Sequence, residues 1–205
     1  MDGSKRHRRV PRQERSRFTV ECILIGTSQV MVDQGYAGLS TNRVAEVSGV
    51  GISTVYQYFP NKQALVMALL DRHALAQMHA VLDVIAVSAE RGLLEVCRAA
   101  FQALSEVHRQ DRDLQVALLG CLDEFRHEGQ VLEARQRVIE GVRQLIRSRS
   151  GAEPPPNAAW MAVMAGEGVV HAAMVESPTL LTDPDFLEQG AQLLYRYLAG
   201  FEAGA

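Results

Sequence analysis

Apolar residues recur every three or four positions along almost the whole chain, which is the spacing of an amphipathic α-helix. Glycine, proline and short polar clusters interrupt this pattern. The segments between the interruptions are predicted as about nine helices, over residues 12–34, 41–48, 52–59, 62–88, 93–109, 114–128, 131–149, 158–176 and 184–200. We find no alternating strand pattern and no internal repeat. The sequence therefore predicts an all-α protein.

The first helix should brace the two short helices that follow it. Its core-facing stripe is predicted from residues at three-to-four spacing, namely Phe18, Cys22, Ile25 and Val32, with Leu24 and Met31 beside them. Gly35 should end this helix.

Two short helices joined by a tight glycine turn follow at residues 41–48 and 52–59. Ser40 suits the N-cap of the first, because its hydroxyl accepts a backbone N–H of the opening turn. Gly49 suits the left-handed conformation that closes a helix, and Gly51 is an acceptable N-cap for the second. Pro60 cannot continue a helix and disfavours helical geometry at Phe59. This arrangement is a helix-turn-helix.

The second short helix has an exposed face without charge. Val55 and Phe59 lie four apart and should pack inward. The remaining positions carry hydroxyls, an amide, an aliphatic group and two aromatic rings: Ile52, Ser53, Thr54, Tyr56, Gln57 and Tyr58. Such groups suit a surface that meets base edges and phosphates. The alternative is a helical hairpin buried in a larger bundle, where the tyrosines and the glutamine would need buried partners.

At these residues the chain resembles the DNA-binding domain of the TetR family of bacterial repressors. The resemblance covers about residues 18–70, and its matching pieces are Ile23-Leu24, Gly35-Tyr36, Leu39-Ser40-Thr41, Val44-Ala45, Gly49-Val50 and Thr54 to Phe59, followed by Lys62. Two positions depart from the family pattern. Gly51 replaces a common capping serine, at a cost of a few tenths of a kcal/mol. Gly26 replaces a common alanine and costs ~1 kcal/mol of helix propensity.

The resemblance implies a sequence-specific, homodimeric transcriptional repressor that binds a palindromic operator in double-stranded DNA. Carried over position by position, Thr41, Tyr56 and Lys62 match phosphate contacts, and Tyr58 suits either kind of contact. The positions near base edges are Asn42, Ile52, Ser53 and Thr54. The full predicted DNA-binding set also includes Ser40, Arg43 and Gln57. The N-terminal helix-turn-helix domain would contain three helices, and the C-terminal helical bundle would bind the ligand.

The charge distribution changes the picture given by the net charge of −3. Seven basic residues stand against two acidic ones in residues 1–17, so this arm carries +5 and the rest carries −8. We expect a disordered basic arm over 1–17, a helix-turn-helix domain over 18–62 and a ligand-binding and dimerisation domain over 63–205. An arm of this kind can follow the DNA backbone or enter the minor groove. A solubilising tail is the alternative.

The helix predicted over residues 158–176 is rich in small and apolar residues and poor in charge. With the last helix it would form half of a four-helix dimer interface, as the resemblance implies. The interface residues expected from each helix are Ala165 and Ala172, and Leu194 and Leu198. The alternative is that this helix is only the core of the C-terminal domain.

A second set in the C-terminal region combines apolar side chains with isolated polar groups, which suits a small-molecule pocket. Its members are Phe101, Leu104, His108, Leu118, Cys121, Phe125, Trp160 and Met164. The resemblance implies an inducer pocket among these helices, occupied by a small and largely apolar effector. An ordinary hydrophobic core has the same composition.

Other chemistry is scarce in the sequence. We find no phosphate-binding glycine loop, no CxxC pair and no HExxH spacing, so we expect no enzyme activity, no cofactor and no metal site. Glu167 and His171 lie four apart and could share a proton or a metal, or form a structural pair. The odd number of dispersed cysteines predicts reduced, buried thiols in the cytoplasm. The sequence contains no run of 18 apolar residues, so we expect no membrane span. The rival function is a DNA-packaging protein without a ligand.

Overall fold

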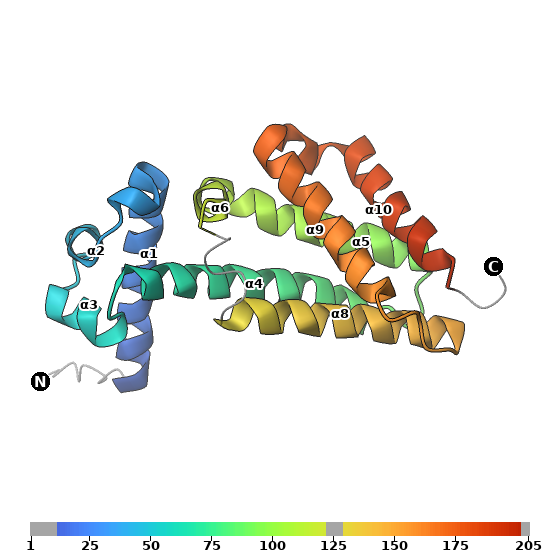
Figure 1. Ribbon diagram of the computed structural model, residues 1–205, viewed down its shortest axis with the longest axis horizontal. Coiled ribbons are helices and arrows are strands. Elements are labelled where there is room, and N and C mark those ends of the chain that lie inside the picture. The colour runs from blue at the N-terminus through green and yellow to red at the C-terminus, as the bar shows by residue number, and fades with distance from the viewer. Residues whose placement is uncertain (1–11, 122–128, 202–205) are drawn as a thin grey trace, which may run out of the picture. The chain divides into compact units, whose positions relative to one another are not determined.

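The computed structural model describes residues 12–121 and 129–201 of the chain. Within these ranges all regular structure is helical, which confirms the predicted all-α class. Contacts divide the chain between Leu69 and Leu70 into two compact units, and the helices are labelled in Figure 1. The first unit contains α1 (Arg12–Gly38), α2 (Thr41–Ser48), α3 (Ile52–Tyr58) and the start of α4 (Lys62–Ala86). The second contains the rest of α4, then α5 (Leu93–Gln110), α6 (Arg112–Leu119), α8 (Gly129–Ser150), α9 (Ala158–Glu176), the short 3₁₀ helix η1 (Pro178–Thr182) and α10 (Pro184–Ala199).

The turns of the first unit follow the predicted glycine and capping chemistry. Gly35 interrupts the helical backbone of α1 with φ 63° and ψ −175°. Ser40 is the N-cap of α2, and its Oγ accepts a hydrogen bond from the backbone N–H of Arg43 at 3.2 Å. Gly49 closes α2 in the left-handed region at φ 68°. Phe59 is extended at φ −134° directly before the proline, as the sequence predicts.

The buried face of α1 is not the predicted one. Phe18, Ile25 and Val32 are 72%, 48% and 46% exposed, so this part of the prediction was wrong. The buried residues are Ile23, Leu24, Thr27, Val30 and Met31. Apolar residues occur almost all round α1, so more than one stripe has helical spacing. Packing against α2 buries a stripe that is displaced by about one residue from the predicted stripe.

Gly26 explains why this face is selected. A Cβ at position 26 would lie 2.8 Å from Ser48 Cβ and 3.0 Å from its backbone nitrogen, so the glycine lets α1 approach α2 closely. We therefore expect Gly26→Ala to lower the free energy of unfolding by roughly 1–2 kcal/mol, because overpacking outweighs the gain in helix propensity. Gly51→Ser is the matched control, since position 51 has open space around it and serine caps slightly better. Denaturant unfolding measures both, and a stabilised Gly26→Ala variant would contradict this packing.

The core of the second unit lies between α5, α9, η1 and α10, and these helices pack on one another (Figure 1). Its centre consists of Phe101, Leu104, Val170, Ala173, Met174 and Leu181. Gly190 of α10 lies so close to the Phe101 ring that an added Cβ would overlap it. Asp183 caps α10 by accepting from the backbone N–H groups of Asp185 and Phe186 at 2.8 and 3.1 Å, and Pro184 occupies the first turn.

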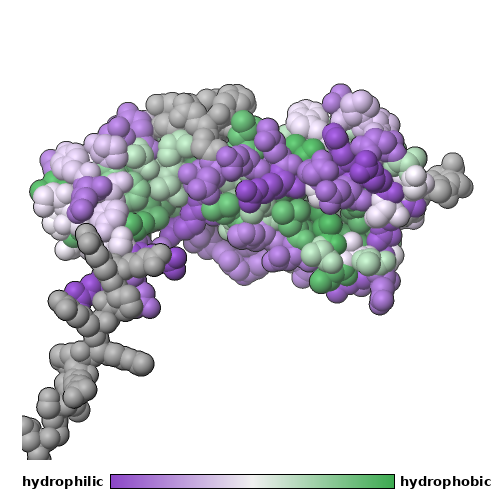
Figure 2. Space-filling view, turned by 90° about the horizontal axis from the view of Figure 1, so that it is seen from below, coloured by the Kyte–Doolittle hydropathy of each residue, from purple (hydrophilic) through white to green (hydrophobic). Residues whose placement is uncertain are grey.

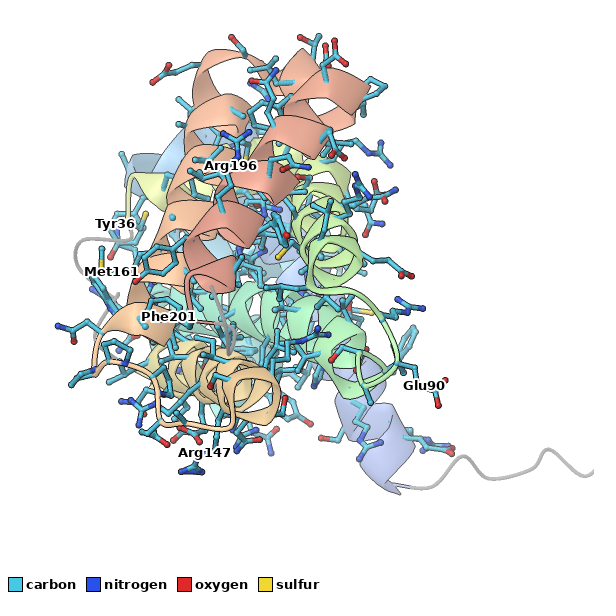
Figure 3. All side chains as sticks on the ribbon, turned by 90° about the vertical axis from the view of Figure 1, so that its right-hand side faces the viewer. Tyr36, Glu90, Arg147, Met161, Arg196 and Phe201 are labelled. Carbon is cyan, nitrogen blue, oxygen red and sulfur yellow. The ribbon has the colours of Figure 1, made fainter. Side chains whose placement is uncertain are left out.

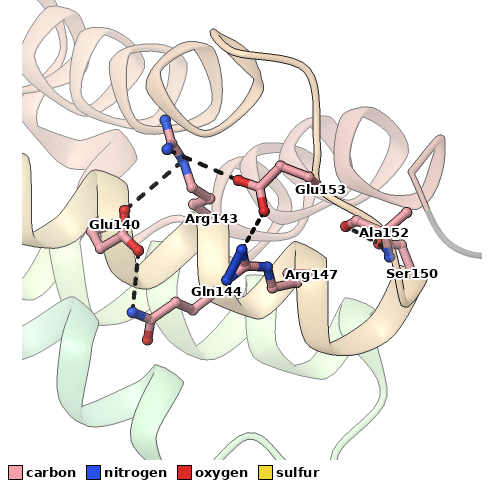
Figure 4. Close-up of polar contacts among 7 residues, drawn as sticks. All are labelled: Glu140, Arg143, Gln144, Arg147, Ser150, Ala152 and Glu153. Carbon is pink, nitrogen blue, oxygen red and sulfur yellow. Dashed lines mark hydrogen bonds and ion pairs between the residues drawn. The ribbon is translucent and has the colours of Figure 1, made fainter.

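Helix α8 is fixed at its C-terminal end by arginines. Arg149 donates to the backbone oxygens of Ser88 and Arg91, which lie in the loop after α4. Figure 4 shows Glu153, in the loop that follows α8, facing Arg147 at 2.6 Å and Arg143 at 4.0 Å. These groups are largely solvated, so each pair contributes little by itself. They fix the course of the loop that leads into α9.

Most helix boundaries differ from the predicted ones by a few residues, and three differences are larger. Residues 12–17 form the first turns of α1 instead of belonging to the predicted arm, and residues 1–11 lie outside the described part. The helix predicted over 114–128 begins earlier, at Arg112, and α6 ends at Leu119, while residues 122–128 lie outside the described residues. The short helix η1 was not predicted.

Apolar and polar side chains both reach the surface, as Figure 2 shows for one face of the molecule. Among the described helices, α9 alone is long and apolar enough to cross a membrane by length and composition. One side of α9 nevertheless packs on α5, α8 and α10. It therefore contributes to the core of the second unit.

Candidate functional site

Helix α3 presents the uncharged face expected from the sequence. Val55 is fully buried and Phe59 is 8% exposed, so both side chains anchor the helix to the first unit. On the other side, Ser53 and Gln57 are exposed, and Ile52 and Tyr56 are 38% and 51% exposed. Thr54 lies half-buried between the two sides. The exposed groups can donate and accept hydrogen bonds without bringing a charge of their own.

Two hydroxyl pairs hold the tyrosines of α3 in place. Thr41 is buried, and its Oγ1 donates to Tyr56 Oη at 3.0 Å. The phenolic hydrogen of Tyr56 is therefore left to donate outward. Tyr58 Oη lies 3.0 Å from Ser16 Oγ of α1. Thr41 thus positions a neighbouring tyrosine instead of standing on the surface.

Lys62 begins α4 and is already engaged within the first unit. Its Nζ donates to the backbone oxygen of Tyr36 at 3.3 Å and lies 4.2 Å from the centre of the Tyr36 ring. This contact combines a hydrogen bond with a cation–π interaction. Ser40, Asn42 and Arg43 are exposed at the start of α2, and Arg43 pairs with Glu46 at 2.9 Å. The predicted DNA-binding residues thus lie at the N-cap of α2, on α2 and α3, and at the first residue of α4.

The second unit contains a largely aliphatic cavity of about 100 Å³, here called the apolar cavity. Helices α4, α5, α8, α9 and α10 all contribute to its wall. Most of the lining is apolar, with Phe101, Leu104, Val138 and Leu198 among the side chains. An engineered cavity of roughly 150 Å³ suffices to hold benzene. The apolar cavity is therefore of the right order for a small organic molecule.

A second cavity of about 60 Å³ adjoins the first and is here called the polar cavity. Gln77, Arg135 and Glu167 line both cavities, and His73, Gln115 and His171 line only the polar one. Arg135 Nε lies 3.8 Å from Glu167 Oε2. The Arg135–Glu167 ion pair and Gln77 thus lie where the apolar cavity and the polar cavity meet.

Two histidines and Gln77 form a hydrogen-bonded cluster at the polar cavity, and a third histidine packs against it. His108 Nδ1 lies 2.8 Å from the backbone oxygen of Leu104, which can only accept, so Nδ1 carries the proton. His108 Nε2 then accepts from Gln77 Nε2 at 2.9 Å, and the same amide nitrogen lies 2.7 Å from His73 Nε2. The ring of His171 contacts that of His108, with 4.7 Å between their centres. The Gln77 amide can donate to both Nε2 atoms only when the two histidines are neutral.

Burial keeps these histidines neutral. It lowers the pKa of His73 to about 4 and that of His108 to about 3, and the charge of His171 acts in the same direction on both. The pKa of His171 is lowered by burial and then by Arg135. Burial raises the pKa of Glu167, and Arg135 opposes this effect. In the described residues, no group of three histidine, cysteine or carboxylate side chains is arranged to hold a metal ion.

Comparison with known protein families matches both units. A sequence model described as bacterial regulatory proteins of the tetR family covers residues 23–69. A second, described as the tetracycline repressor-like C-terminal domain, covers residues 93–198, which is more than half of the chain. The chain belongs to the TetR family.

Named relatives are similar to this chain over part of its length. The HTH-type transcriptional activator FasR of Mycolicibacterium smegmatis is 38% identical over 71 residues, which are 35% of this chain and 31% of that protein. The uncharacterised HTH-type regulator YvkB of Bacillus subtilis is 40% identical over 58 residues, 28% of this chain and 31% of that protein. The chain thus spans about a third of the length of these relatives.

Solved structures share the fold over nearly the whole chain. A transcriptional regulator of Pseudomonas aeruginosa PAO1 has a TM-score of 0.67 at 20% identity and covers 96% of this chain and 94% of its own. The fatty acid degradation regulator FadR of Bacillus halodurans has a TM-score of 0.68 at 18% identity, covering 86% of this chain and 94% of its own. At these identities the likeness establishes the TetR fold alone.

The structure distributes the predicted pocket residues of this TetR protein unevenly. Phe101 and Leu104 line the apolar cavity, and Leu118 lines the polar one. His108 and Cys121 are buried, and His108 supports the polar cavity through Gln77. Trp160 is 50% exposed, and neither Trp160 nor Met164 belongs to the described lining of either cavity, which corrects their predicted place. Phe125 lies outside the described residues.

Sequence reasoning missed the polar side chains that line the cavities. His73 and Gln77 lie four apart on α4, on the same side as the buried Ala74 and Met78. Arg135 of α8 likewise stands among buried apolar positions. A polar or charged residue within an apolar stripe was the available signal. Glu167 and His171 were considered as a pair, but their contacts are with Arg135 and His108 instead.

The outer side of α9 carries an exposed stripe of small and apolar residues at three-to-four spacing. It consists of Met161, Ala165, Gly168, Ala172 and Val175, here called the α9 stripe; Ala165 is half-buried and the others are exposed. Figure 3 shows Met161 on the outside of α9. On α10, Leu193 is 48% exposed and Leu194 is half-buried, whereas Leu198 is 6% exposed and faces the apolar cavity. Leu198 therefore lies in the wall of the cavity instead of on an open face.

Proposed function

We propose that this TetR-family protein is a homodimeric, sequence-specific transcriptional repressor in the cytoplasm. It would bind a palindromic operator through α3 and release it when a small, largely apolar molecule fills the apolar cavity. The observation that carries the DNA-binding part is the exposed, uncharged face of α3, anchored by Val55 and Phe59. Side chains of this kind at the N-terminal end of a recognition helix reach base edges in the major groove.

Helix α4 offers a physical link between ligand and DNA. At its start, Lys62 is bound to Tyr36 in the helix-turn-helix unit. Further along, His73, Gln77 and Met78 of the same helix line the cavities. A ligand that shifts this part of α4 would move the DNA-binding end of a continuous helix. Linkage then requires operator DNA to weaken ligand binding by the same factor.

Replacing Thr54 and Lys62 separates reading contacts from positioning contacts. Thr54→Ala is expected to relax the preference at one base pair of each half-site, at a cost of about 1–3 kcal/mol for the cognate base. Lys62→Ala is expected to weaken binding to all sequences alike. It should also reduce the salt-dependence slope by about 0.9 for each phosphate that is no longer neutralised, or roughly two per dimer. Binding over a salt series, on operator and on scrambled DNA, measures both effects.

The exposed Arg137 of α8 provides the control for loss of a positive charge. Arg137→Ala should leave both the slope and the specificity unchanged. If Lys62→Ala lowers stability but leaves the slope as in the unmodified protein, Lys62 only holds Tyr36 and touches no phosphate. If Lys62→Ala alters specificity while Thr54→Ala alters only the slope, α3 does not lie in the groove as proposed.

A further inference from the structure

The polar cavity contains a deeply buried acceptor that lacks a partner. Gln115 is 4% exposed, and its Nε2 donates to the backbone oxygen of Val107 at 2.8 Å. Because that backbone oxygen can only accept, the amide orientation is fixed and Oε1 is the free end. Among the described residues, Oε1 has no hydrogen-bond partner. A buried, unsatisfied acceptor is costly, so a group that donates to it gains binding energy.

The same cavity contains an unsatisfied donor. Arg135 Nε is buried and has no hydrogen-bond partner in the described part of the chain, since its 3.8 Å contact with Glu167 is an ion pair beyond hydrogen-bond distance. The two orphan groups are complementary. A hydroxyl donates one hydrogen and accepts others, so a head group of this type can serve Gln115 and Arg135.

The charges around the polar cavity favour an uncharged head group. Arg135 and Glu167 carry opposite charges and already stand together. A carboxylate would enter beside the Glu167 carboxylate, and an ammonium group would enter beside the Arg135 guanidinium. The neighbouring His73 and His171 supply no balancing charge, because burial keeps both neutral. Either ion would thus be desolvated without a new counter-charge.

We infer that the two adjoining cavities select a small apolar molecule with one uncharged, hydroxyl-type head group. The apolar body would occupy the apolar cavity. The head group would enter the polar cavity, donating to Gln115 Oε1 and accepting from Arg135 Nε. The binding selectivity is argued from these contacts alone. That the bound molecule is the signal that releases DNA rests on the proposed function.

Calorimetry on the full chain near neutral pH tests the selectivity with four probes that share one apolar body. They are para-ethylphenol, its near-isostere para-ethyltoluene, para-ethylbenzoate and para-ethylbenzylamine. We expect para-ethylphenol to bind about tenfold tighter than para-ethyltoluene, which corresponds to two satisfied hydrogen bonds, and the two ions to bind more weakly still. Equal affinity for the phenol and the toluene, a preference for either ion, or no binding by any probe would overturn the inference.

Variants assign the preference to the two orphan groups. Gln115→Leu should reduce the preference for para-ethylphenol over para-ethyltoluene to twofold or less. Gln102→Leu changes an exposed glutamine of α5 and should keep the full preference. Arg135→Met retains an apolar stem and provides a second test if Gln115→Leu folds poorly. A full preference in both cavity variants would contradict the assigned contacts.

DNA binding distinguishes this inference from the proposed function. If para-ethylphenol binds with the expected preference but operator affinity stays constant, the selectivity holds and the effector role fails. If operator affinity responds to a probe that shows no head-group preference, the effector role holds and the selectivity fails.

Discussion

Ala172→Arg is expected to make the protein monomeric and to lower operator affinity by at least about 100-fold. Ala172 is an exposed small residue of the α9 stripe, where a partner helix can approach closely. A specific dimer interface buries about 1,200 Å² or more, and an unpaired arginine inside it is strongly destabilising. A monomer engages only one half-site and loses the 10²–10⁴ of avidity that two linked sites provide. Sedimentation and operator titration measure both losses.

The control for this substitution is Ala76→Arg, which places the same charge on an exposed position of α4. It should leave the mass and the operator affinity unchanged. A dimer of unchanged mass in Ala172→Arg would show that the α9 stripe is not the interface.

Acidification is expected to destabilise the folded protein already at pH values well above those at which ordinary carboxylates titrate. The pKa values of His73 and His108 lie near 4 and 3 in the folded chain, below the ordinary value of 6.5, and that of His171 is also lowered. Below about pH 6.5 the unfolded chain therefore binds protons that the folded chain does not. The stability that these neutral histidines contribute is fully present above this pH and is lost as the pH falls.

The expected loss is roughly 2–4 kcal/mol per pH unit between pH 6 and 5, because each histidine contributes up to ~1.4 kcal/mol per unit. Asp111 and Arg135 are the charged neighbours that act on these rings. The pKa of Glu167 is raised by burial, so this carboxyl acts in the opposite sense above its ordinary value of 4.5 and offsets part of the histidine effect. Urea unfolding at several pH values gives the slope.

Substitution identifies the source of the pH dependence. His108→Leu should reduce the slope by about one histidine's share, whatever its effect on absolute stability. His79→Leu removes an exposed histidine of α4 and should leave the slope unchanged. If the free energy of unfolding depends on pH with the same slope in the unmodified protein and in both variants, the histidine cluster is not neutral in the folded chain.

The DNA-binding end was largely predictable because its structure depends on local backbone chemistry. Ser40, Gly49 and Pro60 each have one conformational role that can be derived from residue type. The face of α1 was not predictable in this way. Its choice depends on how closely α2 approaches Gly26, and that contact joins residues 22 positions apart in sequence.

The cavities were predictable only in outline. Phe101 and Leu104 line the apolar cavity, because the hydrophobic stripe on α5 faces the other helices. Trp160 was misplaced, since α9 is apolar on both its buried and its exposed side and its hydrophobic pattern does not distinguish them. The meeting of Gln77, Arg135 and Glu167 depends on three helices packing together. Sequence spacing carries no information on that packing.

Selection of bound fragments from random double-stranded DNA tests the central claim most directly. We predict a palindromic consensus with two half-sites, because we propose that α3 reads bases and that the protein acts as a dimer. We also expect Thr54→Ala to shift one position of that consensus. Enrichment without any consensus, at affinities that depend only on salt, would contradict a sequence-specific regulator and favour a DNA-packaging protein.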